Sequence, residues 1–139
     1  MQTLKDLMIK EVETITPDET VQTAARYMHI GNFGMLPVVE NHRMIGVITD
    51  RDITIRAVAD GKDCATKVRD VMTEQMICAH ENEMVASAMQ LMSEHQIRRL
   101  PIVNSEKNIV GIVALGDLAR VKDDVTVAGE TLAQISKPG

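Results

Sequence analysis

The chain has almost no aromatic residues and only two cysteines in 139 residues. Tyr27 and Phe33 are its only aromatic side chains, so a core must be built from aliphatic residues and methionines. Cys64 and Cys78 show neither CxxC spacing nor a disulfide framework. No charged, apolar leader opens the sequence, and no apolar run is long enough to span a bilayer. These absences predict a protein of a reducing, cytoplasmic compartment that does not enter a membrane.

Basic residues are outnumbered by acidic ones, 15 to 20, which gives a formal net charge of −5. This charge argues against a nucleic-acid backbone as the main partner. Two basic pairs, Arg51 with Arg56 and Arg98 with Arg99, are compatible with a small anion. No HExxH motif, carboxylate dyad or glycine-rich phosphate loop occurs. The histidines lie in different predicted elements without metal-ligand spacing: His29, His42, His80 and His95. We therefore expect no catalytic centre and no metal site.

The most informative feature present is an internal repeat. Three segments recur in the same order: Leu4–Met8 as Val68–Met72, Met35–Val39 as Arg99–Val103, and Gly46–Asp52 as Gly111–Asp117. A repeat at this spacing, in which Val68 corresponds to Leu4, indicates two similar units, neither of which can bury its apolar face alone. The sequence thus predicts one repeat at 1–60, a linker at 61–66, a second repeat at 67–122 and a tail at 123–139.

Each repeat has the pattern of a β-α-β-β-α unit. Apolar residues at helical spacing predict helices at 19–30 and 83–95, with Asp18 and Asn82 as their N-caps. Two apolar runs around a polar turn predict a hairpin in each copy. Short strands before the first helices and closing helices complete the units: 13–16 and 77–80, then 50–60 and 115–122. In the tail, Leu132 and Ile135 suit either a short helical turn or a frayed end.

The segment from Gly46 to Asp52 carries the chemistry. A glycine in a buried strand permits close approach of another group. Thr49 ends this strand and Asp52 falls in the next helical turn, which puts a hydroxyl and a carboxylate near the same opening. The carboxylate could accept both hydroxyls of a ribose, and Thr49, Asp50 and the helix N-terminus suit a phosphate. The residues alone leave open a second interpretation, in which Thr49 and Asp52 only cap the helix.

These motifs resemble the CBS domain. The resemblance rests on the duplicated unit, on the strands containing Leu36-Pro37 and Leu100-Pro101, and on the G-h-h-T-x-x-D pattern of Gly46–Asp52. Two such domains in tandem resemble a Bateman module, as in stand-alone bacterial CBS-pair proteins. The resemblance covers residues 1–122. It implies an α/β (α+β) fold in which two β-α-β-β-α repeats pack around a pseudo-two-fold axis and leave two clefts. Some family members bind AMP, ADP, ATP or S-adenosylmethionine there.

The family pattern implies a set of residues for each cleft. In the first, Asp52 would bind the ribose, Met76 and Ile77 the base, and Arg99 the phosphate. The whole set for this cleft is Val47, Thr49, Asp50, Asp52, Met76, Ile77, Ile97 and Arg99. The second cleft would use Thr16, Phe33, Gly34, Met35, Ile112 and Asp117. There Ala114 and Met35 replace a hydroxyl and an arginine, so we expect weaker phosphate binding.

The resemblance predicts a non-catalytic regulatory module that senses an adenine nucleotide or S-adenosylmethionine. It implies no required cofactor, a homodimer and an effector protein that the sequence does not name. An alternative is a ligand-free structural or protein-interaction module, against which Thr49, Asp52 and Arg99 argue. A redox or metal-responsive role for Cys64, Cys78 and the histidines is disfavoured by their scatter.

Overall fold

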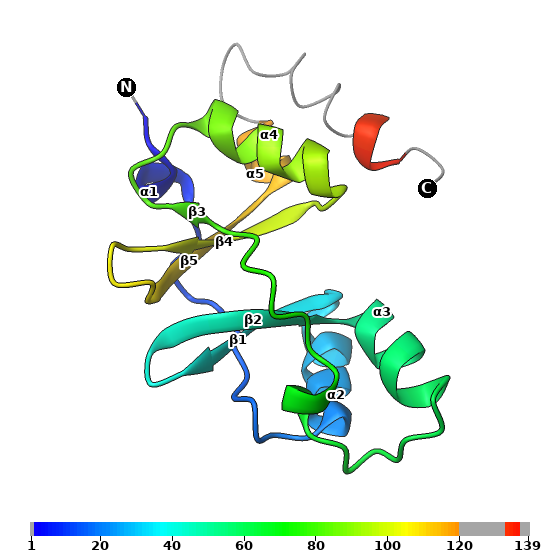
Figure 1. Ribbon diagram of the computed structural model, residues 1–139. Coiled ribbons are helices and arrows are strands. Elements are labelled where there is room, and N and C mark those ends of the chain that lie inside the picture. Colours follow the sequence, from blue (N-terminus) through cyan, green and yellow to red (C-terminus); the bar gives the residue numbers. More distant parts are fainter. Residues whose placement is uncertain (1, 120–132, 137–139) are drawn as a thin grey trace. The chain divides into compact units, whose positions relative to one another are not determined.

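The computed structural model describes residues 2–119 and 133–136. The chain divides into two compact units, residues 13–76 and residues 1–12 with 77–139. Each unit has one hairpin sheet covered by helices, as Figure 1 shows. In the described part of the chain, no helix is long and apolar enough to cross a membrane.

The unit of residues 13–76 is built on a two-stranded antiparallel sheet. Strands β1 (Met35–Glu40) and β2 (Arg43–Thr49) form its hairpin, with a bulge after Val38. The predicted first strand is reduced to a single parallel bridge between Ile15 and Val38. The helices of this unit are α2 (Val21–Gly31), α3 (Asp50–Asp52), the π-helix η1 (Ile53–Val58) and the 3₁₀-helix η2 (Val68–Asp70).

The second unit has a three-stranded sheet in the order β3-β4-β5. Here the predicted first strand is present, because Ala79 and His80 pair in parallel with Ile102 and Val103. The strands are β3 (Ala79–His80), β4 (Arg99–Val103) and β5 (Ile109–Ala114). The helices are α1 (Leu4–Leu7), α4 (Val85–His95) and α5 (Leu115–Leu118). The predicted β-α-β-β-α order is therefore found complete in this copy.

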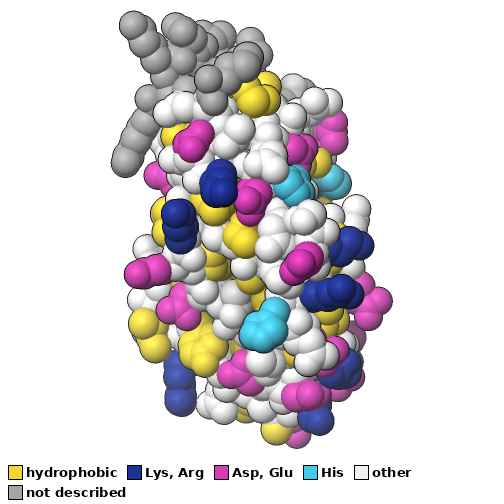
Figure 2. Space-filling model, turned by 90° about the vertical axis from the view of Figure 1, so that its left-hand side faces the viewer, with side chains coloured by type: hydrophobic (Ala, Val, Ile, Leu, Met, Phe, Trp, Pro, Cys, Tyr) yellow, Lys and Arg dark blue, Asp and Glu magenta, His cyan; other side chains and the backbone are white. Residues whose placement is uncertain are grey.

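Each unit has its own aliphatic core, as the lack of aromatics requires. Methionines fill space in both, because their flexible side chains adapt to irregular gaps. The first cluster consists of Ile15, Val21, Ala24, Met28, Leu36, Val38, Ile48, Ala57, Val68, Val71 and Met72. The second consists of Leu4, Ala79, Val85, Ala88, Met89, Met92, Leu100, Ile102, Val113, Leu115 and Leu118. On the face shown in Figure 2, acidic and basic side chains are interspersed.

The opening segments of the two sequence repeats are exchanged between the compact units. Helix α1, from the first repeat, belongs to the unit of the second, where the Leu4 N–H donates to the Glu83 carbonyl (2.9 Å). Helix η2, from the second repeat, belongs to the other unit, where the Val68 N–H donates to the Glu19 backbone carbonyl (2.8 Å). The repeats predicted at 1–60 and 67–122 therefore differ from the compact units, because packing and not chain order defines a unit.

Two predicted helix caps are wrong. Helix α2 begins at Val21, and Thr20 caps it by accepting a hydrogen bond from the Thr23 N–H (3.2 Å). Asp18 instead lies 3.3 Å from an Arg69 nitrogen in an exposed ion pair. Its position is too early because residues 16–19 first form a turn, in which the Glu19 carboxylate accepts the Thr16 N–H.

The cap predicted for the corresponding helix fails for the same reason. Helix α4 begins at Val85, and its N-cap residue Met84 makes no side-chain hydrogen bond. Glu83 closes the preceding turn by accepting the His80 N–H. Asn82 lies within that turn and donates its N–H to the imidazole of His80 (3.1 Å).

The closing helices and the linker also differ in detail from prediction. The helix predicted at 50–60 is α3 followed by the π-helix η1. Helix α5 ends at Leu118, and part of the predicted 115–122 helix lies outside the described residues. The linker covers the start of α2, because the Val21 N–H donates to the Thr66 carbonyl (2.9 Å). Of the predicted tail turn, Leu132 lies outside the described residues, whereas Ile135 packs against the second core.

Candidate functional site

Gly46 permits a close backbone approach in the middle of β2, as its position in a buried strand predicts. A Cβ atom on Gly46 would overlap the carbonyl oxygen of Thr73. That approach allows two backbone hydrogen bonds next to the glycine. The Val47 N–H donates to the Thr73 carbonyl (2.9 Å), and the Thr73 N–H donates to the Val47 carbonyl (2.8 Å). The chain that follows η2 is thereby fixed against β2.

Thr49 and Asp52 form a reciprocal cap at the start of α3. The Thr49 hydroxyl oxygen accepts the Asp52 N–H (3.0 Å), and Asp52 Oδ2 accepts the Thr49 N–H (3.0 Å). Such a capping box satisfies two backbone donors that the helix would otherwise leave free. The capping role considered for these residues is thus present in the structure, and it fixes the position of the Asp52 carboxylate.

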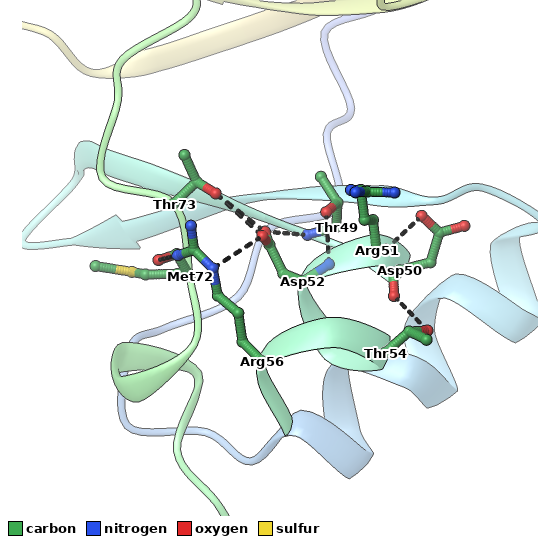
Figure 3. Close-up of polar contacts among 8 residues, drawn as sticks. All are labelled: Thr49, Asp50, Arg51, Asp52, Thr54, Arg56, Met72 and Thr73. Atoms are coloured by element: carbon green, nitrogen blue, oxygen red, sulfur yellow. Dashed lines mark hydrogen bonds and ion pairs between the residues drawn. The ribbon is translucent and has the colours of Figure 1, made fainter. Parts of the chain in front are cut away.

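The Asp52 carboxylate also contacts two residues that belong to neither candidate set, Thr73 and Arg56. The Thr73 hydroxyl lies 3.1 Å from Asp52 Oδ1 and 3.3 Å from Oδ2. The Arg56 guanidinium donates to the Met72 carbonyl (3.1 Å), and its Nε lies 3.9 Å from Asp52 Oδ1. Figure 3 shows these groups pointing toward the carboxylate. Asp52 is only 8% exposed, so these contacts partly replace the solvation that burial removes.

One of the two missed residues had a signal in the sequence. Arg56 lies four residues after Asp52 in a predicted helix, and opposite charges at this spacing face one another. Thr73 had no local signal, because 21 positions separate it from Asp52. Only the packing of the segment after η2 onto β2 brings it to the carboxylate.

Gly34 and Asp50, which were assigned to different clefts, lie in contact. The Asp50 N–H donates to the Gly34 carbonyl (3.0 Å), and a Cβ atom on Gly34 would lie 2.8 Å from Asp50 Oδ2. The hairpin register explains this contact, because Met35 is the cross-strand partner of Thr49. The residue before β1 and the residue after β2 therefore meet at the open end of the hairpin.

The candidate residues on β1 and β2 share the face of the hairpin that points away from the core cluster. Ile48 belongs to that cluster, and side chains alternate along a strand, so Val47 and Thr49 face the other side. Met35 shares this side because it pairs with Thr49. Although Val47 lies on the face opposite the core cluster, its side chain is buried, with only 6% of its surface exposed.

The hairpin of the other unit has the same arrangement. Arg99 pairs with Ala114, on the side opposite the core residues Leu100 and Val113. Ile112 also lies on this side and is buried. Arg99 is half-buried, whereas the preceding Arg98 is exposed. In both hairpins, the candidate residues on the strands thus lie on the face of the sheet opposite the core of the same unit.

The remaining candidates are placed as follows. Ile77 and Ile97 pack against the core of the second unit, and Phe33 packs against the core of the first. Met76, the last residue of the first unit, is 36% exposed. Thr16 is exposed, and Asp117 is half-buried in α5. The N-cap of α5 is Ala114, which makes no side-chain hydrogen bond.

Each candidate set therefore draws on both compact units. For the first set, the unit of residues 13–76 supplies Val47, Thr49, Asp50, Asp52 and Met76, and the other unit supplies Ile77, Ile97 and Arg99. For the second set, the unit of residues 13–76 supplies Thr16, Phe33, Gly34 and Met35, and the other unit supplies Ile112 and Asp117.

The cysteines and histidines are the side chains that redox or metal chemistry would use. Among the residues that the structure describes, no group of three histidine, cysteine or acidic side chains could hold a metal ion. Cys64 is an exposed free thiol, and Cys78 is a half-buried one. Burial raises the pKa of the Cys78 thiol, and the nearby Glu83 carboxylate raises it further.

Comparison with known proteins decides the family. Residues 4–58 and 68–124 each match the family model of the CBS domain. The chain belongs to the CBS-domain family. It is 46% identical over 136 residues to the CBS domain-containing protein YhcV of Bacillus subtilis, covering 98% of this chain and 96% of that protein. The resemblance inferred from the repeated motifs is confirmed.

Solved structures of CBS pairs are also similar to this chain. Hypoxic Response Protein I with two coordinated zinc ions has a TM-score of 0.78 and 33% identity, covering 86% of this chain and 98% of that one. The CBS domain pair of protein MJ0100 in complex with 5-methylthioadenosine and S-adenosyl-L-methionine has a TM-score of 0.74 and 30% identity. The match covers 87% of this chain and 95% of that one. These likenesses confirm the predicted fold class of two CBS repeats.

Proposed function

We propose that this CBS pair is a non-catalytic sensor that binds an adenosine-containing ligand, such as AMP, ADP, ATP or S-adenosylmethionine. The observation that carries the proposal is the Asp52 carboxylate, which is buried and fixed by the Thr49 N–H at the end of β2. A carboxylate held in one orientation can accept two hydroxyls of a ribose with little loss of side-chain entropy. The adenosine derivatives bound by the MJ0100 pair support this ligand class.

The other residues of the first set would contact different parts of the ligand. A phosphate or another charged group would be bound by Thr49, Asp50 and Arg99. The base would make apolar contacts with Val47, Met76, Ile77 and Ile97. The second set has Ala114 in place of a hydroxyl and Met35 in place of an arginine. Loss of one charge-assisted bond costs roughly 1.5–3 kcal/mol, so the second set should bind a phosphate at least tenfold more weakly.

Calorimetric titration of the purified protein with adenosine, AMP, ADP, ATP and S-adenosylmethionine tests the proposal. We expect binding of at least one of them with a stoichiometry near one per chain. Asp52→Asn should weaken that binding tenfold or more, because a neutral amide is a poorer acceptor for two hydroxyls. Asp60→Asn, an exposed residue beyond η1, is the matched control. Circular dichroism should show that both variants remain folded.

The alternative is a ligand-free structural or protein-interaction module. The capping box favours it, because this pairing gives Thr49 and Asp52 a structural role without any ligand. If no adenosine compound binds at millimolar concentration, or if Asp52→Asn binds as tightly as the parent, the alternative stands.

The proposal extends to the assembly and its output. We infer a homodimer, because Ile30, Ile55 and Val58 are exposed apolar side chains on α2 and η1, where they would favour contact with a second copy. We infer that the module acts on a separate effector protein in the cytoplasm, without nucleic acid or membrane as a partner. The acidic net charge argues against nucleic acid as a partner.

A further inference from the structure

The carboxylate that we assign to the ligand already has a protein hydroxyl as its partner. Thr73 Oγ1 lies 3.1 Å from Asp52 Oδ1 and 3.3 Å from Oδ2. These two similar distances place the hydroxyl across the edge that joins both carboxylate oxygens. A vicinal diol that donates one bond to each oxygen would need the same edge.

We propose that Thr73 is an internal competitor for the ribose at Asp52, and that ligand binding displaces its hydroxyl. The inference rests on the proposed function and adds a regulatory consequence to it. The Thr49 N–H bond to Oδ2 can remain, because it belongs to the helix cap. Only the Thr73 contact has to be exchanged for the ligand.

The position of Thr73 in the chain gives this exchange a consequence. Its backbone is paired with Val47, and the carbonyl of the preceding residue, Met72, accepts from Arg56 (3.1 Å). Three exposed residues, Glu74 to Met76, then lead directly to Ile77, where the chain enters the other compact unit again. Release of the Thr73 side chain would therefore weaken the attachment of the segment that connects the two units.

The described part of the second copy lacks this arrangement. Ile9 occupies the position that corresponds to Thr73, and it forms the same backbone pair with Ile112 (2.8 and 3.0 Å). An isoleucine has no hydroxyl to offer to Asp117, which corresponds to Asp52. The competition is therefore a property of one repeat, and it does not follow from the fold that the two repeats share.

Thr73→Val tests the proposal, because valine has nearly the shape of threonine, keeps the backbone N–H and carbonyl that pair with Val47, and lacks only the hydroxyl. Thr54→Val is the matched control, since the Thr54 hydroxyl donates to the Asp50 carbonyl and not to Asp52. We expect Thr73→Val to bind adenosine about tenfold more tightly than the parent, and Thr54→Val to match the parent. With 2′-deoxyadenosine, which has no vicinal diol, the gain should be much smaller.

Hydrogen exchange followed by NMR provides the second measurement. The Thr73 N–H is bonded to the Val47 carbonyl (2.8 Å), so its exchange rate reports how firmly the segment is attached. Adenosine should accelerate exchange of this amide in the parent. In Thr73→Val the exchange should already be fast, and adenosine should leave it unchanged.

The outcomes separate this inference from the proposed function. If the parent binds adenosine but Thr73→Val binds it equally or more weakly, Thr73 does not compete and the inference is overturned, while the proposed function stands. Unchanged exchange at Thr73 in the adenosine-bound parent would also overturn it. If adenosine binds to Thr73→Val alone, the competition is supported. If adenosine binds to neither protein, no competition for its ribose exists and the inference is overturned, whereas the proposed function fails only if AMP, ADP, ATP and S-adenosylmethionine also do not bind.

Discussion

Gly46→Ala should destabilise the unit of residues 13–76, because the added methyl group has no space. It would overlap the Thr73 carbonyl oxygen and lie 3.3 Å from the Glu74 Cα atom. Both neighbours are backbone atoms, so neither can rotate away as the end of a side chain can. The segment after η2 must therefore move away from β2.

The cost follows from the hydrogen bonds that this movement would break. The backbone pair between Val47 and Thr73 contributes about 0.5–1.5 kcal/mol for each of its two bonds, and the Thr73 bond to a carboxylate about 1.5–3 kcal/mol. Replacing glycine by alanine recovers about 0.4–1 kcal/mol through the unfolded chain. We therefore expect a net loss of about 2 kcal/mol or more in the free energy of unfolding.

Tyr27 provides a fluorescence probe for this unit, because the chain has no tryptophan and no second tyrosine. Urea unfolding of Gly46→Ala should shift to a lower midpoint by this probe. Gly116→Ala is the control, since Gly116 is exposed in α5 and a Cβ there meets nothing within 4 Å; because it lies in the other unit, its unfolding is followed by circular dichroism. The control should be neutral or slightly stabilised. An unchanged or higher midpoint for Gly46→Ala would refute the argument from close approach.

Three further predictions concern the ligand, the thiols and the assembly. Arg99→Ala should weaken AMP binding by roughly 1.5–3 kcal/mol and should change adenosine binding little, because adenosine has no phosphate. Arg98→Ala is the control, since Arg98 is exposed. Equal losses for both ligands would contradict a phosphate contact. Iodoacetamide at pH 8 should alkylate Cys64 before Cys78, because the raised pKa of Cys78 lowers its thiolate fraction; peptide mapping that found equal rates would contradict this. Light scattering should give about twice the chain mass of 15.3 kDa at micromolar concentration, and a monomer mass would exclude the dimer.

The fold could be predicted from the sequence because each element occurs twice, once in each repeat. Where one copy is ambiguous, the other supports the assignment, as the hairpins at β1-β2 and β4-β5 show. The boundaries were less accurate, because local competition decides them. At the start of α2, the turn closed by Glu19 moves the cap from Asp18 to Thr20.

The exchange of opening segments could not be read from the sequence. Leu4 and Val68 are fully buried apolar residues in equivalent positions, and either could fill the space beside either pair of helices. Periodicity identifies such residues as core residues but does not say which core they enter. That choice depends on how the chain crosses between the units, which is a tertiary property.

The candidate site shows the same division between local and tertiary information. Thr49 and Asp52 could be selected because a hydroxyl and a carboxylate three residues apart meet at a helix start. Their two proposed roles are compatible: the cap uses Asp52 Oδ2 and the Thr49 N–H, and it thereby orients the carboxylate so that both oxygens lie near the Thr73 hydroxyl. A cap that merely stabilised α3 would not require a hydroxyl across both carboxylate oxygens. The contact with Thr73 is therefore the feature that distinguishes this carboxylate from an ordinary helix cap.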